Sequence, residues 1–599
     1  MMRKSVLKTL LLTSGVLLST PAMAQQSESD WVPMDDVTEA PAAAVPPSKA
    51  DAYAAPVYSV PTYSTPDFDA PSAAAPATKA PAQKASSKRE GRRVEIVPYL
   101  EAAQIIRADL KNGGDVLTYS TIAAGVDGTV ATRRAQAQVS LRYERRFALD
   151  KNARDQDVIT GIARGTAALT RNFSVEAGGI AARSSVDGRG GASNIPGGNT
   201  DNVTQIYSVY AGPNFSAQTG ELNINAAYRA GYAKAESRAD IALPAGQRRF
   251  DQFDDSISHV ATASVGAKPG MLPFGWSVNG NWKREDAQHL GSRFDSRTVR
   301  GDLTWPLSPN VAFVGGVGFE HVVISERDAL RDAGVMPILG ADGRFESDPN
   351  SPRLEAFHKD GLIWDAGVLW QPGPRTSVEG RFGKRYGTNT YVGSLSYRPG
   401  RDWAVGASVY DVVSGFGGYL NDSLSALPTQ FRSVRNPLSG EVGGCAFGQA
   451  GASCLNDILQ NASSAAFRQR GVTGTFSGNV GGWDSGLALG FNRRTLIAAQ
   501  LGAQAEVDGL TDDSYFALAY LGRNIGARTR FESNVYASYI DPGFADAQDT
   551  LSTGANAALS RQIIRGLSAS AAVGLDSYRQ QDFDSDLIAS ALLGLRYSF

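Results

Sequence analysis

The sequence predicts an all-β fold: a transmembrane, antiparallel, up-and-down β-barrel of about 22 strands (range roughly 16 to 24) preceded by a disordered segment rich in Pro and Ala. Three observations predict it. Apolar and polar residues alternate with a period of two through residues 93–599, the connections are short at one end and long at the other, and tryptophans gather near the short turns. A barrel of this kind satisfies its backbone inside a bilayer without helices.

The last strand gives the clearest alternation. One face carries Leu587, Ala589, Ala591, Leu593, Leu595, Tyr597 and Phe599, and the other carries Ser590, Gly594, Arg596 and Ser598. An apolar face against lipid and a polar face toward water produce this pattern. The ending resembles the terminal signal of bacterial outer-membrane barrels, in which Tyr597 and Phe599 would be read by the barrel-assembly machinery.

Earlier strands follow the same rule. In 276–285, Trp276, Val278, Gly280 and Trp282 alternate with polar residues, and 136–147 alternates in the same way. Neither segment fits a strand that is buried on both faces, because each would carry charges into a dry core.

The connections divide into two classes. Counting strands back from Phe599 places the turns 170–172, 306–310, 371–375, 398–402, 481–482 and 523–526 at one end, which we assign to the periplasm. The same count places the connections 185–201, 235–255, 324–359, 414–466 and 495–512 outside the cell. An even number of strands also places both chain ends in the periplasm.

Tryptophan positions support this orientation, since the indole ring prefers a membrane–water interface. Near the short turns, and with lipid-facing parity, lie Trp276, Trp305, Trp370, Trp403 and Trp483. Trp282 and Trp364 fall toward the opposite strand ends and predict a second, outer girdle.

Two segments precede the predicted barrel. Residues 1–24 combine Arg3 and Lys4, an apolar run and an Ala-Met-Ala cleavage site, which is typical of a secretory signal peptide. Residues 25–92 are rich in Pro, Ala, Ser and Thr and predict a disordered periplasmic linker. We expect an inert spacer, with contact to peptidoglycan or to polysaccharide-export components as the alternative.

Composition excludes several classes of function. The formal net charge of −2 gives no indication of a nucleic-acid partner. Only two cysteines occur, Cys445 and Cys454, and in an exported chain they predict a local disulfide within the longest connection. No cofactor or metal site is predicted, because a metal would need more ligands than this pair.

The sequence contains no catalytic motif, so we do not expect an enzyme. The four histidines, His259, His289, His321 and His358, form no recognised metal or catalytic pattern. His321 with its neighbour Glu320 is the one pair that a barrel enzyme would use. A solvated pair at a loop edge is the favoured interpretation.

Charged residues with inward parity are the candidates for lining a pore, where their fields would select permeants. Any one of them also fits a simple cross-strand ion pair that holds the wall together. The candidates are Arg142, Glu144, Arg146, Lys283, Glu285, Arg300, Asp302, Glu379, Arg381, Arg385, Arg398, Arg530, Glu532 and Arg596.

The first strands carry a family resemblance. Residues 99–104, 108–119 and 141–147 resemble the opening of the β-barrel porin family of outer-membrane proteins that is associated with exopolysaccharide operons. The resemblance extends over about 94–599 and implies a barrel without catalytic residues. It also suggests a conduit for a sugar polymer.

Two functions remain open at this stage. The first is an outer-membrane pore for hydrophilic solutes or a sugar polymer, since a barrel of about 22 strands encloses a wide lumen unless something fills it. The second is a structural or adhesive anchor that presents long outer loops without transport. The Pro/Ala-rich lead cannot fold into a plug domain, although the long connections can still fold inward.

Overall fold

The computed structural model describes residues 93–111, 116–149, 155–185, 203–237, 253–270, 272–332, 336–340, 344–400, 402–448, 451–455, 459, 462–543, 549–580 and 585–599. The predicted signal peptide and linker, 1–92, lie outside the described residues. No helix within these described ranges has the length and apolarity needed to cross a bilayer.

Twenty-two strands form one antiparallel sheet, and the prediction of a 22-strand barrel is confirmed. They are β1 (Arg93–Asp109), β2 (Val116–Ala131), β3 (Ala135–Ala148), β4 (Gln156–Ala168), β5 (Phe173–Ser185), β6 (Val203–Thr219), β7 (Leu222–Ser237), β8 (Asp255–Ala267), β9 (Gly275–Ala287), β10 (Arg293–Ser308), β11 (Val311–Glu326), β14 (Leu354–Gly373), β15 (Thr376–Arg385), β16 (Thr388–Tyr397), β17 (Trp403–Ser414), β21 (Ala466–Val480), β22 (Trp483–Ile497), β23 (Thr511–Ile525), β24 (Thr529–Asp541), β25 (Thr550–Ile564), β26 (Leu567–Gln580) and β27 (Asp586–Ser598).

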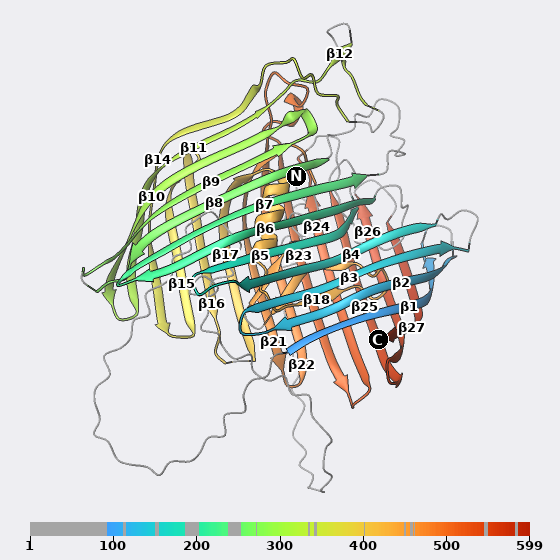
Figure 1. Cartoon of the computed structure of the whole chain (residues 1–599). Helices are drawn as coiled ribbons and strands as arrows, with labels where there is room; N and C mark the ends of the chain where they lie inside the picture. The colour runs from blue at the N-terminus through green and yellow to red at the C-terminus, as the bar shows by residue number, and fades with distance from the viewer. Residues whose placement is uncertain are drawn as a thin grey trace, which may run out of the picture. The chain divides into compact units, whose positions relative to one another are not determined.

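The first and last strands close the sheet. β1 pairs with β27 in a register that runs from Tyr99 opposite Ser598 to Asp109 opposite Ile588. Every other barrel strand pairs with its sequence neighbours in the wall (Figure 1). Closure leaves no unpaired sheet edge, which is the condition for a β-structure within lipid.

The barrel has two distinct ends. Alternating strand direction puts the turns β4–β5, β10–β11, β14–β15, β16–β17, β21–β22 and β23–β24 at one end, here called the short-turn end, together with the start of β1 and the end of β27. The longer connections leave from the opposite end, here called the long-connection end. The predicted grouping of the connections therefore agrees with the strand order.

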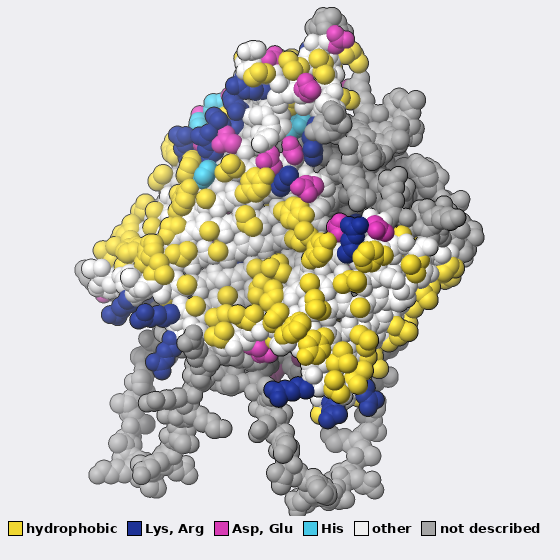
Figure 2. Space-filling view, turned by 45° about the vertical axis from the view of Figure 1, so that its right-hand side comes forward, with side chains coloured by type: hydrophobic (Ala, Val, Ile, Leu, Met, Phe, Trp, Pro, Cys, Tyr) yellow, Lys and Arg dark blue, Asp and Glu magenta, His cyan; other side chains and the backbone are white. Residues whose placement is uncertain are grey.

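Large apolar side chains cover the outside of the wall. Leu593, Phe319 and Val299 are more than 60% exposed in the middle of their strands. Figure 2 shows hydrophobic side chains across the face of the wall, with Lys and Arg toward its two ends. Exposed apolar surface on this scale is typical of a barrel surrounded by lipid.

Aromatic rings mark the short-turn end. Trp305 stacks near Phe274, with ring centroids 6.1 Å apart, and Trp403 contacts Tyr397 at 5.6 Å. Trp483 lies beside Phe531 at 6.3 Å. Tyr597 and Phe599 also face outward there, 46% and 68% exposed, while their role as an assembly signal stays a prediction.

Short elements occupy two of the long connections. β12 (Arg331–Asp332) and β13 (Met336–Pro337) pair beyond β11. Between β17 and β21 lie helix α2 (Phe416–Ser425) and the three-stranded sheet of β18 (Arg432–Arg435), β19 (Val442–Gly448) and β20 (Gly451–Cys454). Single helical turns, η2 (His289–Gly291) and η3 (Ala505–Val507), follow β9 and β22.

Connection 414–466 leaves the wall at the long-connection end, as expected, and of the two directions that the sequence left open its described part takes the inward one. All ten residues of α2 are buried, and the helix packs against β5 to β9 from the inside. In Figure 1 this golden helix stands between the barrel walls. We call residues 415–465 the lumen loop.

Candidate functional site: the occupied lumen

The N-terminus of helix α2 is hydrogen-bonded to a carboxylate of the barrel wall. The backbone N–H groups of Gly417 and Gly418 each donate to the carboxylate of Glu285 on β9, both at 2.9 Å. The first N–H groups of a helix have no partner within it, and its dipole favours a negative charge there. Glu285 therefore anchors the start of the lumen loop.

The other end of α2 is held by charge. Asp422 pairs with Lys283 on β9 and, at 3.1 Å, with Arg229 on β7. The Asp422 side chain is 5% exposed and that of Lys283 is 8% exposed. Removing one member of a buried pair leaves the other charge uncompensated, which costs about 3–5 kcal/mol.

Between these anchors, Asn421 joins two strands. The hydroxyl of Ser208 donates to the Asn421 amide oxygen at 2.7 Å, and the amide nitrogen donates to Ser258 at 3.0 Å. The wall approaches closely here, because a Cβ built on Gly231 would lie 2.3 Å from the Asn421 amide nitrogen. A larger residue at 231 would push the helix away from the wall.

Apolar side chains complete the contact. Phe416, Leu420, Leu424 and Leu427 are at most 1% exposed and belong to one cluster with residues of the wall. The ring of Phe416 lies 4.6 Å, centroid to centroid, from that of Phe253. Burying each such side chain contributes about 1.5–3 kcal/mol, so the loop is docked by a core like that of a soluble protein.

The second half of the lumen loop reaches the other walls. Leu438 packs with Ala103 and Ile105 of β1 and with Leu592 of β27. Phe447 clusters with three residues of β23, namely Phe516, Leu518 and Tyr520. A disulfide joins Cys445 to Cys454 across the paired strands β19 and β20.

The lumen loop also extends along the barrel axis. It leaves β17 at the long-connection end, yet the hydroxyl of Thr429 donates to Gln136, the second residue of β3, at 2.8 Å. Gln136 lies at the short-turn end. The loop therefore crosses the lumen from wall to wall and runs through most of its length.

Five predicted inward residues contact the loop or the pairs that support it. Arg142 pairs with Glu101 at 2.7 Å, and Glu144 pairs with both Arg142 and Arg146. Arg146 also donates to the Ser439 carbonyl of the loop at 2.6 Å. Lys283 and Glu285 are the two anchors described above.

Five others form ion pairs within the wall. Arg300 and Arg381 each pair with both Asp302 and Asp365. Arg381 also lies 2.5 Å from Glu379. Arg385 lies 3.3 Å from Glu320. These charged groups form ion pairs with one another, so their first role is to stabilise the wall.

The remaining four lie toward the short-turn end. Arg530 pairs with Glu532 at 2.7 Å and with Asp484 at 3.1 Å, and Arg596 pairs with Asp127 at 2.6 Å. Arg398 lies in the turn after β16, where its backbone N–H donates to the Arg375 carbonyl. That any of the fourteen lines a pore stays a prediction.

Burial shifts titratable groups of the loop, and it lowers the pKa of Arg435. Burial raises the pKa of Glu441, and the guanidinium of Arg183, 3.9 Å away, partly offsets the rise. A carboxyl group in this position holds a proton more readily than one in water. Protonation would weaken its attraction to Arg183.

A polar gap remains between the loop and one wall. A cavity of about 180 Å³ is lined by Val434, Arg435, Pro437, Tyr520, Arg530, Glu532, Asn534 and Asn556. Further along the same side, Arg107 is 5% exposed, and none of its guanidinium nitrogens has a hydrogen-bond partner within the described ranges. The hydroxyls of Ser552 and Ser590 and the amide oxygen of Asn556 share this property.

Buried polar atoms without protein partners are normally hydrated. We call this side of the lumen, along β1 and β23 to β27, the polar seam. Leu438 and Phe447 of the loop also make apolar contacts on this side, so the seam runs beside them.

Sequence reasoning missed the groups that dock the loop. No sequence motif marked the docking residues of the loop, which are Gly417, Gly418, Asn421 and Asp422. Arg229, the partner of Asp422 on the wall, was not singled out either. A signal was nevertheless present. Large apolar residues recur at 416, 420, 424 and 427, which is the spacing of a buried helical face rather than of a solvated loop.

Comparisons with known proteins give a likeness of fold only. No family model and no curated protein matches the chain. The resemblance to the β-barrel porin family therefore stays a prediction.

Solved structures that match include the ferric-catecholate import receptor Fiu of E. coli K12 in its closed form, with 11% identity and a TM-score of 0.42 over 84% of this chain and 81% of that one. The siderophore receptor PiuA of Acinetobacter baumannii matches with 9% identity and a TM-score of 0.42, over 84% and 82% of the two chains. The copper transporter OprC matches with 12% identity and a TM-score of 0.39, over 84% and 81%.

Proposed function

We propose that this protein is an outer-membrane channel of Gram-negative bacteria that the lumen loop holds in a state of low conductance. Hydrophilic solutes pass along the polar seam, and the passage widens when the loop leaves its docking site. The observation that carries this proposal is the loop itself. It contacts opposite walls and is anchored through Glu285 and Asp422.

Membrane location is supported by the outside of the barrel. Large apolar side chains are exposed in mid-strand, and tryptophans flank them at the short-turn end. In bacterial outer-membrane barrels the short turns face the periplasm. We therefore assign the short-turn end, and with it both ends of the described chain, to the periplasm.

The nature of the seam favours small polar permeants. Its groups include guanidinium, hydroxyl, amide and carboxylate, so it offers hydrogen bonds without one dominant charge. The docked loop contacts opposite walls of the lumen, which disfavours passage of a sugar polymer. Export of a polymer, as the porin-family resemblance suggests, would require undocking.

A barrel that conducts nothing is the second candidate, because a filled lumen also suits a structural or adhesive anchor. Planar-bilayer recordings distinguish the two. The purified chain would be compared with a variant in which 416–462 are replaced by a short Gly/Ser linker. A matched control would replace 331–340, which contain the hairpin β12–β13.

We expect small steps from the parent and the control, and steps several-fold larger from the loop variant, because a barrel of 22 strands encloses a wide lumen. A silent parent with a strongly conducting loop variant would support the anchor, with the loop as a permanent seal. Folded barrels that stay silent in all three forms would overturn the channel.

A further inference from the structure

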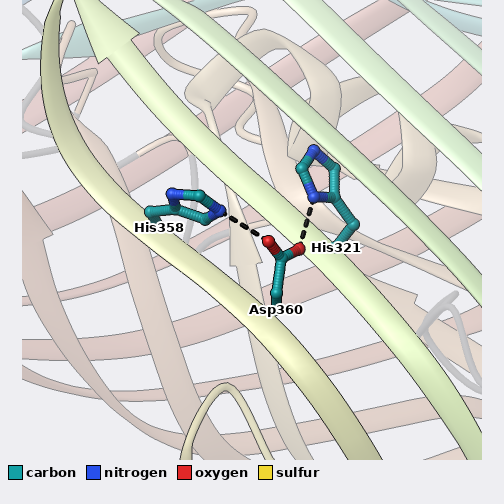
Figure 3. A group of neighbouring side chains, drawn as sticks. All are labelled: His321, His358 and Asp360. Carbon is teal, nitrogen blue, oxygen red and sulfur yellow. Dashed lines mark hydrogen bonds and ion pairs between the residues drawn. The ribbon is translucent and has the colours of Figure 1, made fainter.

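Three side chains that are far apart in the sequence meet on the outside of the barrel. His321 lies on β11, and His358 and Asp360 lie on β14, near the long-connection end (Figure 3). On β11 the outward set includes Phe313, Val317 and Phe319, and His321 continues it. Glu320 faces the lumen instead and pairs with Arg385, so the wall separates the predicted His321–Glu320 pair.

Strand register brings the three together. Asp360 lies directly opposite His321 in the β11–β14 ladder, and His358 shares its face two residues earlier. The Asp360 carboxylate binds His321 Nδ1 through one oxygen and His358 Nε2, at 2.8 Å, through the other. One ligand atom from each of the three residues lies within 4.8 Å of the others.

A second carboxylate orients one of the imidazoles. Glu355 lies 3.2 Å from His358 Nδ1, on the side of the ring that faces away from Asp360. A carboxylate that takes the N–H of one ring nitrogen leaves the other nitrogen free to bind a metal. Metal-ligating histidines almost always donate their second ring N–H to a carboxylate, a backbone carbonyl or water.

The surrounding charge is compatible with a cation. Arg297 is the positive residue opposite His321 in the β10–β11 ladder, and it is held by Asp295 at 2.9 Å. Lys359, between the two ligands of β14, alternates to the opposite face of the strand. Asp360 and Glu355 are 59% and 58% exposed, so their charges are available to an ion from solvent.

We propose that His321, His358 and Asp360 form a surface site for a divalent transition-metal ion, with Zn²⁺ as its representative, and that Glu355 positions His358. Two imidazoles and one carboxylate suit zinc, copper or nickel, whereas Ca²⁺ and Mg²⁺ prefer oxygen ligands alone. Zinc ligands lie about 2.0–2.2 Å from the metal. The two ring nitrogens already contact the Asp360 carboxylate, so a small rotation of these exposed side chains that separates the nitrogens from the carboxylate oxygens admits the ion between them.

The site keeps coordination positions open. Three protein ligands leave room for water or for an anionic oxygen beside the barrel, as in zinc sites that are not purely structural. Because the site lies on the outer wall, its occupancy is independent of the lumen loop. The inference therefore goes beyond the proposed channel.

The test is a Zn²⁺ titration of the purified, untagged barrel in detergent against a chelating indicator. We expect one equivalent to bind. His321→Ala and His358→Ala should each weaken binding at least tenfold, and Glu355→Gln by about tenfold. His259→Ala is the matched control, since His259 lies near the outer end of β8 beside Tyr228 and should leave the affinity unchanged.

A second measurement, the absorption spectrum of bound Co²⁺, does not depend on the affinity. Co²⁺ in place of Zn²⁺ should give visible absorption bands from the parent and from His259→Ala, and these bands should be lost in His321→Ala. Heat-modifiable gel mobility checks that each variant is folded. The proposal is overturned if the folded parent shows no saturable binding, or if His321→Ala and His358→Ala bind as tightly as the parent.

Discussion

Replacing Asp422 by Ala should release the lumen loop. The carboxylate of Asp422 is the shared partner of Lys283 and Arg229, and its side chain is 5% exposed. Without it, two cations remain at a buried contact between the loop and the wall. The cost of breaking such a pair is about 3–5 kcal/mol.

This cost falls on the docked state alone, because Lys283 and Arg229 become hydrated when the loop leaves. A change of 1.4 kcal/mol is a factor of ten in an equilibrium constant. The undocked population should therefore rise by a factor of about 10² to 4 × 10³.

Single-channel recording in planar bilayers measures this shift as the frequency of large openings. Asp513→Ala is the matched control, since it removes an ion pair with Arg493, which is 56% exposed on the outer wall. Such a pair contributes about 0–1 kcal/mol, so gating should not change. If folded Asp422→Ala opens no more often than Asp513→Ala, the lumen loop is not held by this pair and the docking argument is refuted.

Three further predictions follow from the wall and the loop. Leu593 is 70% exposed in mid-strand, and Leu593→Arg should destabilise the bilayer-inserted barrel by about 2–4 kcal/mol in denaturant titrations. Leu501 is 84% exposed outside the strands, and Leu501→Arg should change the free energy of unfolding by less than about 0.5 kcal/mol. Reduction of the Cys445–Cys454 disulfide with dithiothreitol removes a constraint of about 2.5 kcal/mol on the loop, so brief openings should become more frequent. Dithiothreitol should have no such effect on a chain in which both cysteines are replaced by Ala. Gly417→Val should also raise the frequency of openings, because a Cβ built there would lie 2.0 Å from a hydroxyl on β8; a parent-like recording would contradict the close contact.

The barrel could be predicted from the sequence because its rule is local. Each strand needs one apolar face and one polar face, and short turns with nearby tryptophans mark one end. Strand direction then fixes at which end every connection leaves the wall. These properties depend on parity alone, so no long-range contact had to be known.

The lumen loop could not be predicted in the same way. Parity gives the end at which 414–466 leaves the barrel but not the direction in which it folds. Its docking depends on Glu285 meeting two backbone N–H groups and on Asp422 meeting residues of β7 and β9, which are contacts across 132 or more sequence positions. Only the apolar spacing from Phe416 to Leu427 gave a local sign of burial.

The histidine cluster shows a second limit of the sequence. His321 and Glu320 are neighbours in the chain but face opposite sides of the wall. His321 and Asp360 are 39 positions apart and lie opposite each other, because the β11–β14 register pairs them. Register across a long connection is set by the folded sheet, so spacing along the chain does not reveal it.

The position of the lumen loop is the central claim, and cysteine labelling of intact cells tests it most directly. The variants Thr429→Cys and Leu501→Cys would be treated with a maleimide that does not cross the outer membrane. We predict rapid labelling at position 501, which is 84% exposed at the long-connection end, and protection at position 429, which contacts Gln136 at the short-turn end. Equal labelling at both positions would place the connection outside the barrel and contradict the account.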